Sequence, residues 1–214
     1  MKKIIQTLLL LPLVFSTTNV YADKFAPPEP ITVTSNNKEF GLKIIPGEGV
    51  INRSRAKAVL ERKTQNSIEF ELVNETSPVQ AFVSNQGVAV TIDEWYGRGY
   101  KHVVVFYDSN GKLLKDYMLE DILTKDEIKK HVEQSVSNRW WLLGPHRPMR
   151  PDEIKKHEKW RKSLAWWAKI ITKSIPATSN DQPQFQFSED GKKFILKTGW
   201  GKVLKFNLET GRKN

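Results

Sequence analysis

The first half of the chain alternates between short apolar runs and polar turn residues. From Ile31 to Leu119 these runs are rich in β-branched and aromatic residues and are five to seven residues long. Runs of this kind, bounded by polar or glycine-containing breaks, are typical of antiparallel strands. The clearest are "FGLKII", "KAVLER", "SIEFELV", "VAVTI" and "HVVVFY". We therefore predict a β-rich segment over residues 31–119.

Two breaks in this segment have the composition of tight turns. "SNQG" spans Ser84–Gly87, and "DSNG" spans Asp108–Gly111. In each break, polar residues lead to a glycine that can supply the positive φ of a hairpin turn. Both breaks are therefore predicted to join neighbouring antiparallel strands.

The strand pattern stops between Glu120 and Ser174, where helical signals replace it. "TKDE" at Thr124–Glu127 is a capping box, in which the threonine accepts from a free first-turn amide and the glutamate reaches back. A second helix is predicted over residues 152–173, after Pro151, a residue favoured at the first helical position. The alternating pattern then returns over residues 183–208.

These patterns predict a mainly β fold of the α+β class. Antiparallel sheets, arranged as a sandwich or in a propeller-like manner, are interrupted by a helical insertion. We expect one domain over residues 31–214, with β structure at 31–119 and 183–208 and the insertion at 120–174. A proline-rich lead-in, "DKFAPPEP", precedes it at residues 23–30.

The hexapeptide "DEIKKH" occurs twice, at Asp126–His131 and at Asp152–His157. Each copy places a glutamate four residues before a histidine, which is a spacing that metal sites use on helices. The same letters are also those of a helix start, because acids in the first turn are stabilised by the helix dipole. We favour the helix interpretation and expect no metal and no cofactor.

The tail of the chain repeats an earlier stretch. "VSNQGVAVTI" at Val83–Ile92 aligns with "FSEDGKKFIL" at Phe187–Leu196, and "FYDSNGK" at Phe106–Lys112 aligns with "FNLETGR" at Phe206–Arg212. These units resemble the turn-and-strand repeats of WD40-like and other secreted β-propeller proteins. The chain also resembles exported bacterial proteins of uncharacterised function that carry "DEW…GYG…VVVIYDSNGKL" stretches. The resemblance implies propeller-like sheets and no particular activity.

Residues 1–22 have the features of a cleavable signal peptide. Lys2 and Lys3 precede an apolar stretch, and "VYA" ends at Ala22 with the small residues that a signal peptidase recognises. We predict cleavage after Ala22 and a periplasmic or secreted protein of 192 residues. There is no cysteine, which excludes disulfides and a lipid-modified cysteine.

The exported chain would carry 32 basic and 24 acidic residues, a net charge of +8. A basic protein outside the cytoplasm attracts anionic partners. An anionic polysaccharide or a protein partner is expected, and nucleic acid is not. The predicted helix at 152–173 is basic and rich in tryptophan, so the stretch Lys155–Lys173 could also lie on an anionic membrane surface.

Polar and aromatic residues concentrate in "TIDEWYGRGYKH" at Thr91–His102, between two predicted strands. Adjacent residues on an extended chain point to opposite faces, so its two acids cannot act as a carboxylate pair. The aromatic side chains could stack on a sugar ring, while an acid accepts hydroxyl hydrogen bonds. The alternative is that they close the core at the strand ends. The candidate residues are Asp93, Glu94, Trp95, Arg98, Tyr100 and His102.

A second cluster is "SNRWWLLGPHRPMR" at Ser137–Arg150. Basic side chains beside aromatic rings suit anionic glycans or phosphates. The alternative is a hydrophobic connection between helices and sheet. The candidates here are Trp140, Trp141, His146 and Arg147.

None of the common catalytic motifs is present: there is no G-x-S-x-G elbow, no H-E-x-x-H and no glycine-rich phosphate loop. The sequence therefore leaves open whether the protein is an enzyme. Our main hypothesis is an exported, non-catalytic binding or scaffolding module. The alternatives are a glycan hydrolase that uses Asp93 or Glu94, and a membrane-surface protein that docks through residues 152–173.

Overall fold

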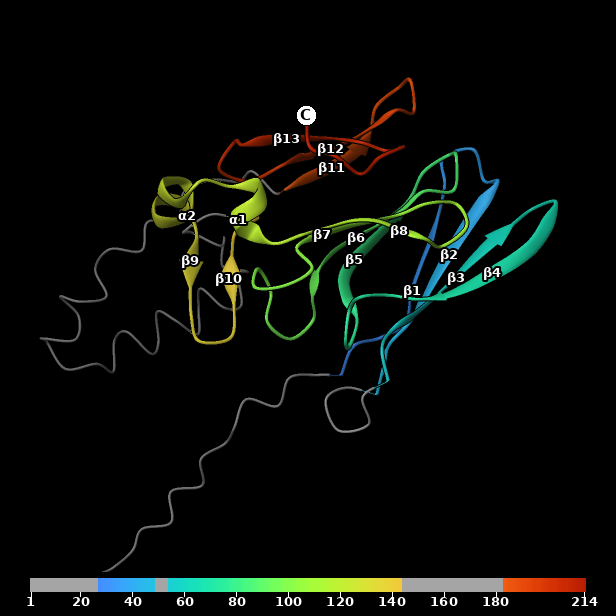
Figure 1. The fold of residues 1–214 in the computed structure, drawn as a ribbon, viewed down its shortest axis with the longest axis horizontal. Helices are drawn as coiled ribbons and strands as arrows, with labels where there is room; N and C mark the ends of the chain where they lie inside the picture. Colours follow the sequence, from blue (N-terminus) through green and yellow to red (C-terminus); the bar gives the residue numbers. More distant parts are fainter. Residues whose placement is uncertain (1–26, 49–53, 144–182) are drawn as a thin grey trace, which may run out of the picture.

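The computed structural model describes residues 27–48, 54–143 and 183–214. The fold is mainly β, as predicted, with antiparallel sheets and two short helices (Figure 1). The first sheet contains β1 (Ile31–Thr34), β2 (Phe40–Ile45), β3 (Lys57–Arg62) and β4 (Gln65–Glu71). The middle sheet contains β5 (Pro78–Val83), β6 (Ala89–Glu94), β7 (Val104–Tyr107) and β8 (Leu113–Tyr117). The third sheet contains β11 (Gln184–Phe187), β12 (Lys193–Lys197) and β13 (Val203–Asn207).

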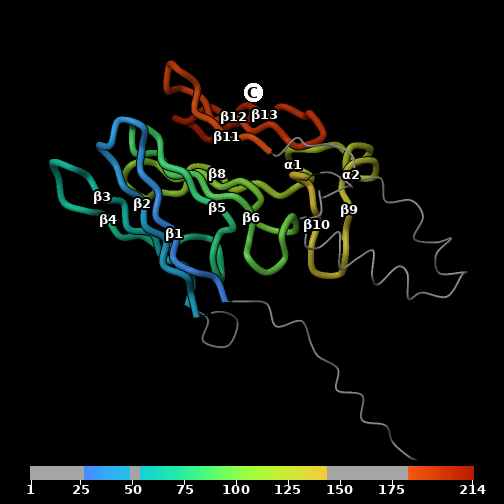
Figure 2. Tube along the Cα trace, turned by 180° about the vertical axis from the view of Figure 1, so that it is seen from behind, coloured from blue at the N-terminus to red at the C-terminus, as the bar shows by residue number. Residues whose placement is uncertain are grey.

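Each of these sheets is a simple meander in which consecutive strands are neighbours. The middle sheet lies between the other two, as both views show (Figures 1 and 2). Within the described residues the sheets stay open, without a closed barrel or propeller. No helix of the described residues is long and apolar enough to span a membrane.

The middle sheet is covered on both faces, and its sequence shows why. Every residue of β6 and β7 is buried. Val104 and Phe106 pack with the third sheet, whereas Val105 and Tyr107 pack with the first sheet. A strand buried on both sides needs apolar residues at consecutive positions, and this accounts for the unbroken run "VVVFY".

Aromatic side chains fill the space between the middle and third sheets. Phe106 lies 5.3 Å from Phe206 and 6.1 Å from Phe194, measured between ring centroids. Phe82 stacks on Phe185 at 5.0 Å. These distances are those of favourable aromatic pairs, each contributing about 0.5–1.5 kcal/mol beyond burial. The middle and third sheets therefore share one core, and the first and middle sheets share another.

The turns of the first aligned pair, Val83–Ile92 and Phe187–Leu196, fold alike. The turns of the second pair differ, because the Gly111 amide donates to the Asp108 carbonyl three residues back, whereas the Gly211 amide donates to the Asn207 carbonyl four residues back. The turns at Ser84–Gly87 and Ser188–Gly191 join the first two strands of the middle and third sheets. In both turns the glycine amide donates to the serine carbonyl, and the glycine has a positive φ, +80° for Gly87 and +65° for Gly191.

A third copy of this turn, missed by the sequence alignment, joins β1 to β2. Ser35 occupies the serine position, and the Lys38 amide donates to the Ser35 carbonyl. Lys38 stands where the other copies have glycine, with a φ of +59°. Because a lysine rarely adopts this conformation, the sequence pattern gave no indication of the repeat.

The turns also pack on one another in a repeated way. A Cβ atom on Gly87 would lie 2.6 Å from the Phe40 ring of the first sheet. A Cβ atom on Gly191 would lie 2.5 Å from the Gln86 amide of the middle sheet. Each turn glycine therefore lies against the preceding sheet, Gly87 against the strand residue Phe40 and Gly191 against the turn residue Gln86.

The segment expected to be helical is described only as far as residue 143. It contains α1 (Leu119–Ile122), α2 (Lys125–His131) and then a hairpin made of β9 (Glu133–Gln134) and β10 (Arg139–Trp140). The Thr124–Glu127 capping box at the start of α2 is confirmed, since each side chain bonds the other residue's backbone amide. The hairpin replaces the expected helix because the polar residues Ser135–Asn138 form a turn that reverses the chain. The predicted helix at 152–173 lies outside the described residues.

Candidate binding surface

The loop between β6 and β7 begins and ends in unusual backbone conformations. Asp93 has a φ of +58° and His102 a φ of +51°, both in the left-handed region that non-glycine residues seldom adopt. Gly97 and Gly99, within the loop, also have positive φ. Such strain persists only where the surroundings fix the backbone, and it concentrates at functional sites. The surrounding structure therefore fixes the backbone conformation of this loop.

Asp93 holds the loop from the inside. Its carboxylate is buried and accepts from the Gly99 amide at 2.9 Å and from the Trp141 indole Nε1 at 3.0 Å to each oxygen. Burial raises the pKa of Asp93 to about 7, although the hydrogen bonds from Gly99 and Trp141 oppose this. The aspartate thereby links the loop to the residue that follows β10.

Replacing Asp93 with asparagine is expected to remove a pH dependence of stability. The folded-state pKa lies above the unfolded value of 3.8, so the folded protein retains a proton that the unfolded chain loses. The contribution is complete below about pH 4 and is lost as the pH rises towards 7. The free energy of unfolding should fall by about 2 kcal/mol between roughly pH 5 and pH 6.5 in the original protein.

Urea titrations at both pH values measure this difference. Asparagine keeps an acceptor oxygen and tolerates a positive φ, so the Asp93→Asn variant should fold. The same pH slope in both proteins would show that Asp93 is ionised throughout this range.

Glu94 faces the opposite direction, as predicted for its neighbouring position. Its carboxylate accepts from the backbone amides of Glu75, Thr76 and Ser77 at 2.9, 3.1 and 3.3 Å. These amides belong to the corner between β4 and β5. Glu94 therefore joins the first sheet to the middle sheet, and the side chain is buried in doing so.

The β9–β10 hairpin lies beside this loop in both views (Figures 1 and 2). The Arg139 amide donates to the Arg98 carbonyl at 2.8 Å, and the Tyr100 hydroxyl donates to the Ser135 carbonyl at 2.7 Å. The Arg139 guanidinium lies 4.5 Å from the centre of the Tyr100 ring. A Cβ atom on Gly99 would lie 2.6 Å from that of Arg139, so glycine is required there. The loop and the hairpin thus form one surface, which we call the loop–hairpin surface.

Aromatic and cationic groups gather on the loop–hairpin surface. The Arg98 guanidinium lies 5.6 Å from the centre of the Trp95 ring, within the range of a cation–π contact. Tyr96 is 42% exposed, and Trp95, Arg98 and Tyr100 are half-buried. An aromatic ring can stack on a sugar ring, and a guanidinium can pair with a carboxylate, so these groups together suit a sugar acid.

The remaining predicted residues are distributed more widely. Trp141 is fully buried in the core between helices and sheets, whereas Trp140 on β10 is half-buried. His102 Nδ1 lies 2.8 Å from an Asp116 carboxylate oxygen on β8. His146 and Arg147 lie outside the described residues. Arg139, which sequence reasoning did not select, contributes both to the loop contact and to an ion pair with Glu120.

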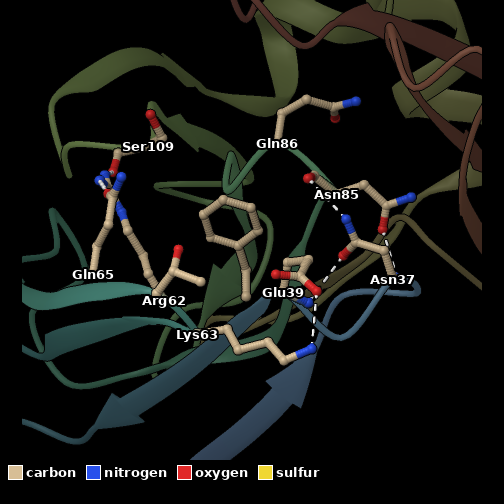
Figure 3. A pocket seen from close by; sticks show the side chains of 10 residues that line it. Asn37, Glu39, Arg62, Lys63, Gln65, Asn85, Gln86 and Ser109 are labelled. Atoms are coloured by element: carbon tan, nitrogen blue, oxygen red, sulfur yellow. Dashed lines mark hydrogen bonds and ion pairs between the residues drawn. The ribbon is translucent and has the colours of Figure 1, made fainter.

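A polar hollow of about 370 Å³ lies at the opposite ends of the strands, between the first and middle sheets (Figure 3). Its side chains bond one another across the gap. The Arg62 guanidinium donates to the Ser109 carbonyl and to Asn110 Oδ1, and Asn37 bonds Asn85. These hydrogen bonds connect the turns of the first and middle sheets across the hollow. The sequence did not predict this hollow.

Compared with the polar hollow, the loop–hairpin surface presents aromatic rings with a cation on a fixed backbone.

The chain matches no protein-family model, no curated protein and no solved structure.

Proposed function

We propose that the protein is an exported, non-catalytic binding module, and that the loop–hairpin surface takes an acidic polysaccharide. The observation that carries this proposal is the placement of the Trp95 ring beside the Arg98 guanidinium, with the exposed Tyr96 in the same loop, on a backbone fixed from both sides. A surface held in this way loses little conformational entropy when it binds. Arg98 would pair with a sugar carboxylate while the rings stack on the sugar.

The acids next to these groups support binding rather than catalysis. The carboxylates of Asp93 and Glu94 are turned into the protein and accept hydrogen bonds from its own backbone and indole groups. The alternative of a glycan hydrolase rests on the raised pKa of Asp93, which would suit a general acid. Asp93 is only 3% exposed, so we prefer the binding function.

The three meanders also support a propeller-like arrangement, which we propose as the finer description of the fold. The support is that the same turn joins the first two strands of all three sheets, and that the turn glycines Gly87 and Gly191 each lie against the preceding sheet. The predicted signal peptide supports export. Membrane docking through Lys155–Lys173 is the third candidate, and it concerns residues outside the described part of the chain.

Truncating either Tyr96 or Arg98 to alanine is expected to weaken polysaccharide binding by at least about tenfold, the effect of losing one important contact. Isothermal titration with polygalacturonate and with alginate measures this effect. A neutral glucan serves as the ligand control, since it lacks the carboxylate that Arg98 would pair with.

The matched variant is Lys63→Ala. Lys63 is an exposed cation at the opposite ends of the strands, so its removal should leave the affinity unchanged. Asp93→Asn and Glu94→Gln distinguish the enzyme alternative, because they would abolish hydrolysis. Unchanged affinity in the Tyr96 and Arg98 variants would contradict the proposal.

A further inference from the structure

The outer face of the third sheet, turned away from the middle sheet, is basic and partly apolar. Its residues alternate with the buried positions of each strand, as the pairing register shows. Val203 is 46% exposed. Shallow hollows of about 520 and 300 Å³ mark this face. No acid lies among the outward strand residues, whereas the turn acids Glu189 and Asp190 line the larger hollow. The outward strand residues are Gln184, Gln186, Lys193, Ile195, Lys197, Val203, Lys205 and Asn207.

The outer face of the first sheet, at the other end of the stack, carries a net charge of −1, and Lys57 and Glu69 form an ion pair on it. Its outward positions alternate with buried residues such as Leu42 and Leu60. Ile45 is 39% exposed and provides an apolar position. Three glutamates outnumber two lysines among the outward residues of β2, β3 and β4. The outward residues of these three strands include Lys43, Ile45, Lys57, Val59, Glu61, Glu69 and Glu71.

The repeated turn predicts how these two faces would meet. At the contact between the middle and third sheets, the third turn residue of the middle sheet, Gln86, lies against the fourth residue of the next turn, Gly191. At the contact between the first and middle sheets the equivalent residue, Asn37, bonds the second residue of the next turn, Asn85. In both contacts the third residue of one turn therefore meets the turn of the next sheet. In the third sheet the position of Gln86 is taken by Asp190, and in the first sheet the position of Gly191 is taken by Lys38. If the stacking of sheets continued by one more step, Asp190 would therefore lie against the turn that contains Lys38 in another molecule.

From these three observations we propose that the outer face of the third sheet binds the outer face of the first sheet of a second copy of this chain, with Asp190 against Lys38. The residues 152–173 of the same chain are a poorer occupant, because they carry a net charge of +4 and would meet the lysine-rich face with the same sign. The contact is head-to-tail. It therefore produces a closed ring if the rotation closes and a longer assembly if it does not.

Charge exchange tests the proposal. Asp190→Lys and Lys38→Asp should each weaken self-association of the purified protein by at least about tenfold. The double variant carries both changes in one chain and should restore the affinity to within about threefold, because the opposite charges face each other again. Sedimentation equilibrium at low and high salt measures the constants, and salt should weaken the original contact.

Lys38→Asp suits its turn, whereas Asp190→Lys removes the hydrogen bonds that Asp190 Oδ1 accepts from the Ser188 hydroxyl and the Lys192 amide. Aspartate tolerates the positive φ of residue 38, and Gln86 shows that this turn position accepts a long side chain. The matched control is Lys112→Glu, an exposed charge reversal in a turn of the middle sheet, which should not change association. A monomer at every concentration would overturn the proposal, and so would a double variant as weak as the single ones. Circular dichroism of each variant confirms that it is folded.

Discussion

Replacing Trp141 with alanine is expected to lower the free energy of unfolding by about 3–5 kcal/mol, the usual cost of truncating a buried tryptophan. Trp141 is completely buried and packs in the core that the helices share with the middle and third sheets. Its indole also donates to Asp93, so the truncation removes a hydrogen bond from a buried carboxylate. Urea denaturation followed by circular dichroism measures the loss.

Two further variants separate packing from hydrogen bonding. Trp141→Phe keeps an aromatic ring but removes the N–H donor. Its free energy of unfolding should therefore lie between that of the unsubstituted protein and that of the alanine variant. Trp140→Ala, at the half-buried neighbouring position, should cost less than about 1.5 kcal/mol. Equal losses at positions 140 and 141 would mean that Trp141 does not connect the hairpin to the core.

Replacing Glu94 with alanine is expected to cost about 3–4 kcal/mol, because three backbone amides at Glu75, Thr76 and Ser77 would lose their acceptor. Two of these amides are buried, and a buried donor without a partner costs more than an exposed one. Glu94→Gln retains one carbonyl oxygen and should cost roughly 1–2 kcal/mol.

Amide hydrogen exchange gives a local measure of the same change. Exchange at residues 75–77 should accelerate strongly in the alanine variant and weakly in the glutamine variant. Exchange at the Ser84–Gly87 turn, at the other ends of the strands, should follow only the global stability. A uniform acceleration throughout the middle sheet would contradict a local role for Glu94.

The strands and turns of this fold could be predicted from sequence because their signals are local. Short apolar runs bounded by polar breaks predicted the strands, and the glycines at positions 87 and 191 predicted two of the three equivalent turns. The third turn was missed since Lys38 adopts a conformation that lysine does not favour on its own. The hairpin at 133–140 was missed because strands of two residues carry almost no periodicity.

The roles of the two acids could not be predicted, because their partners are distant in sequence. Trp141 follows Asp93 by 48 residues. Its indole N–H can donate to Asp93 only because the β9–β10 hairpin packs beside the β6–β7 loop. Glu94 meets amides that precede it by 17 to 19 residues, around a corner between two sheets. Adjacent positions on a strand explained why the two acids face apart, but not what each one meets.

The double covering of the middle sheet has a consequence during synthesis. Val104 and Phe106 are covered by side chains from Phe194 to Leu208, close to the end of the chain. A nascent chain that has emerged only through β8 would therefore expose one apolar side of that sheet to solvent, and such surfaces promote aggregation. The protein should depend on a holding chaperone until its last strands become available.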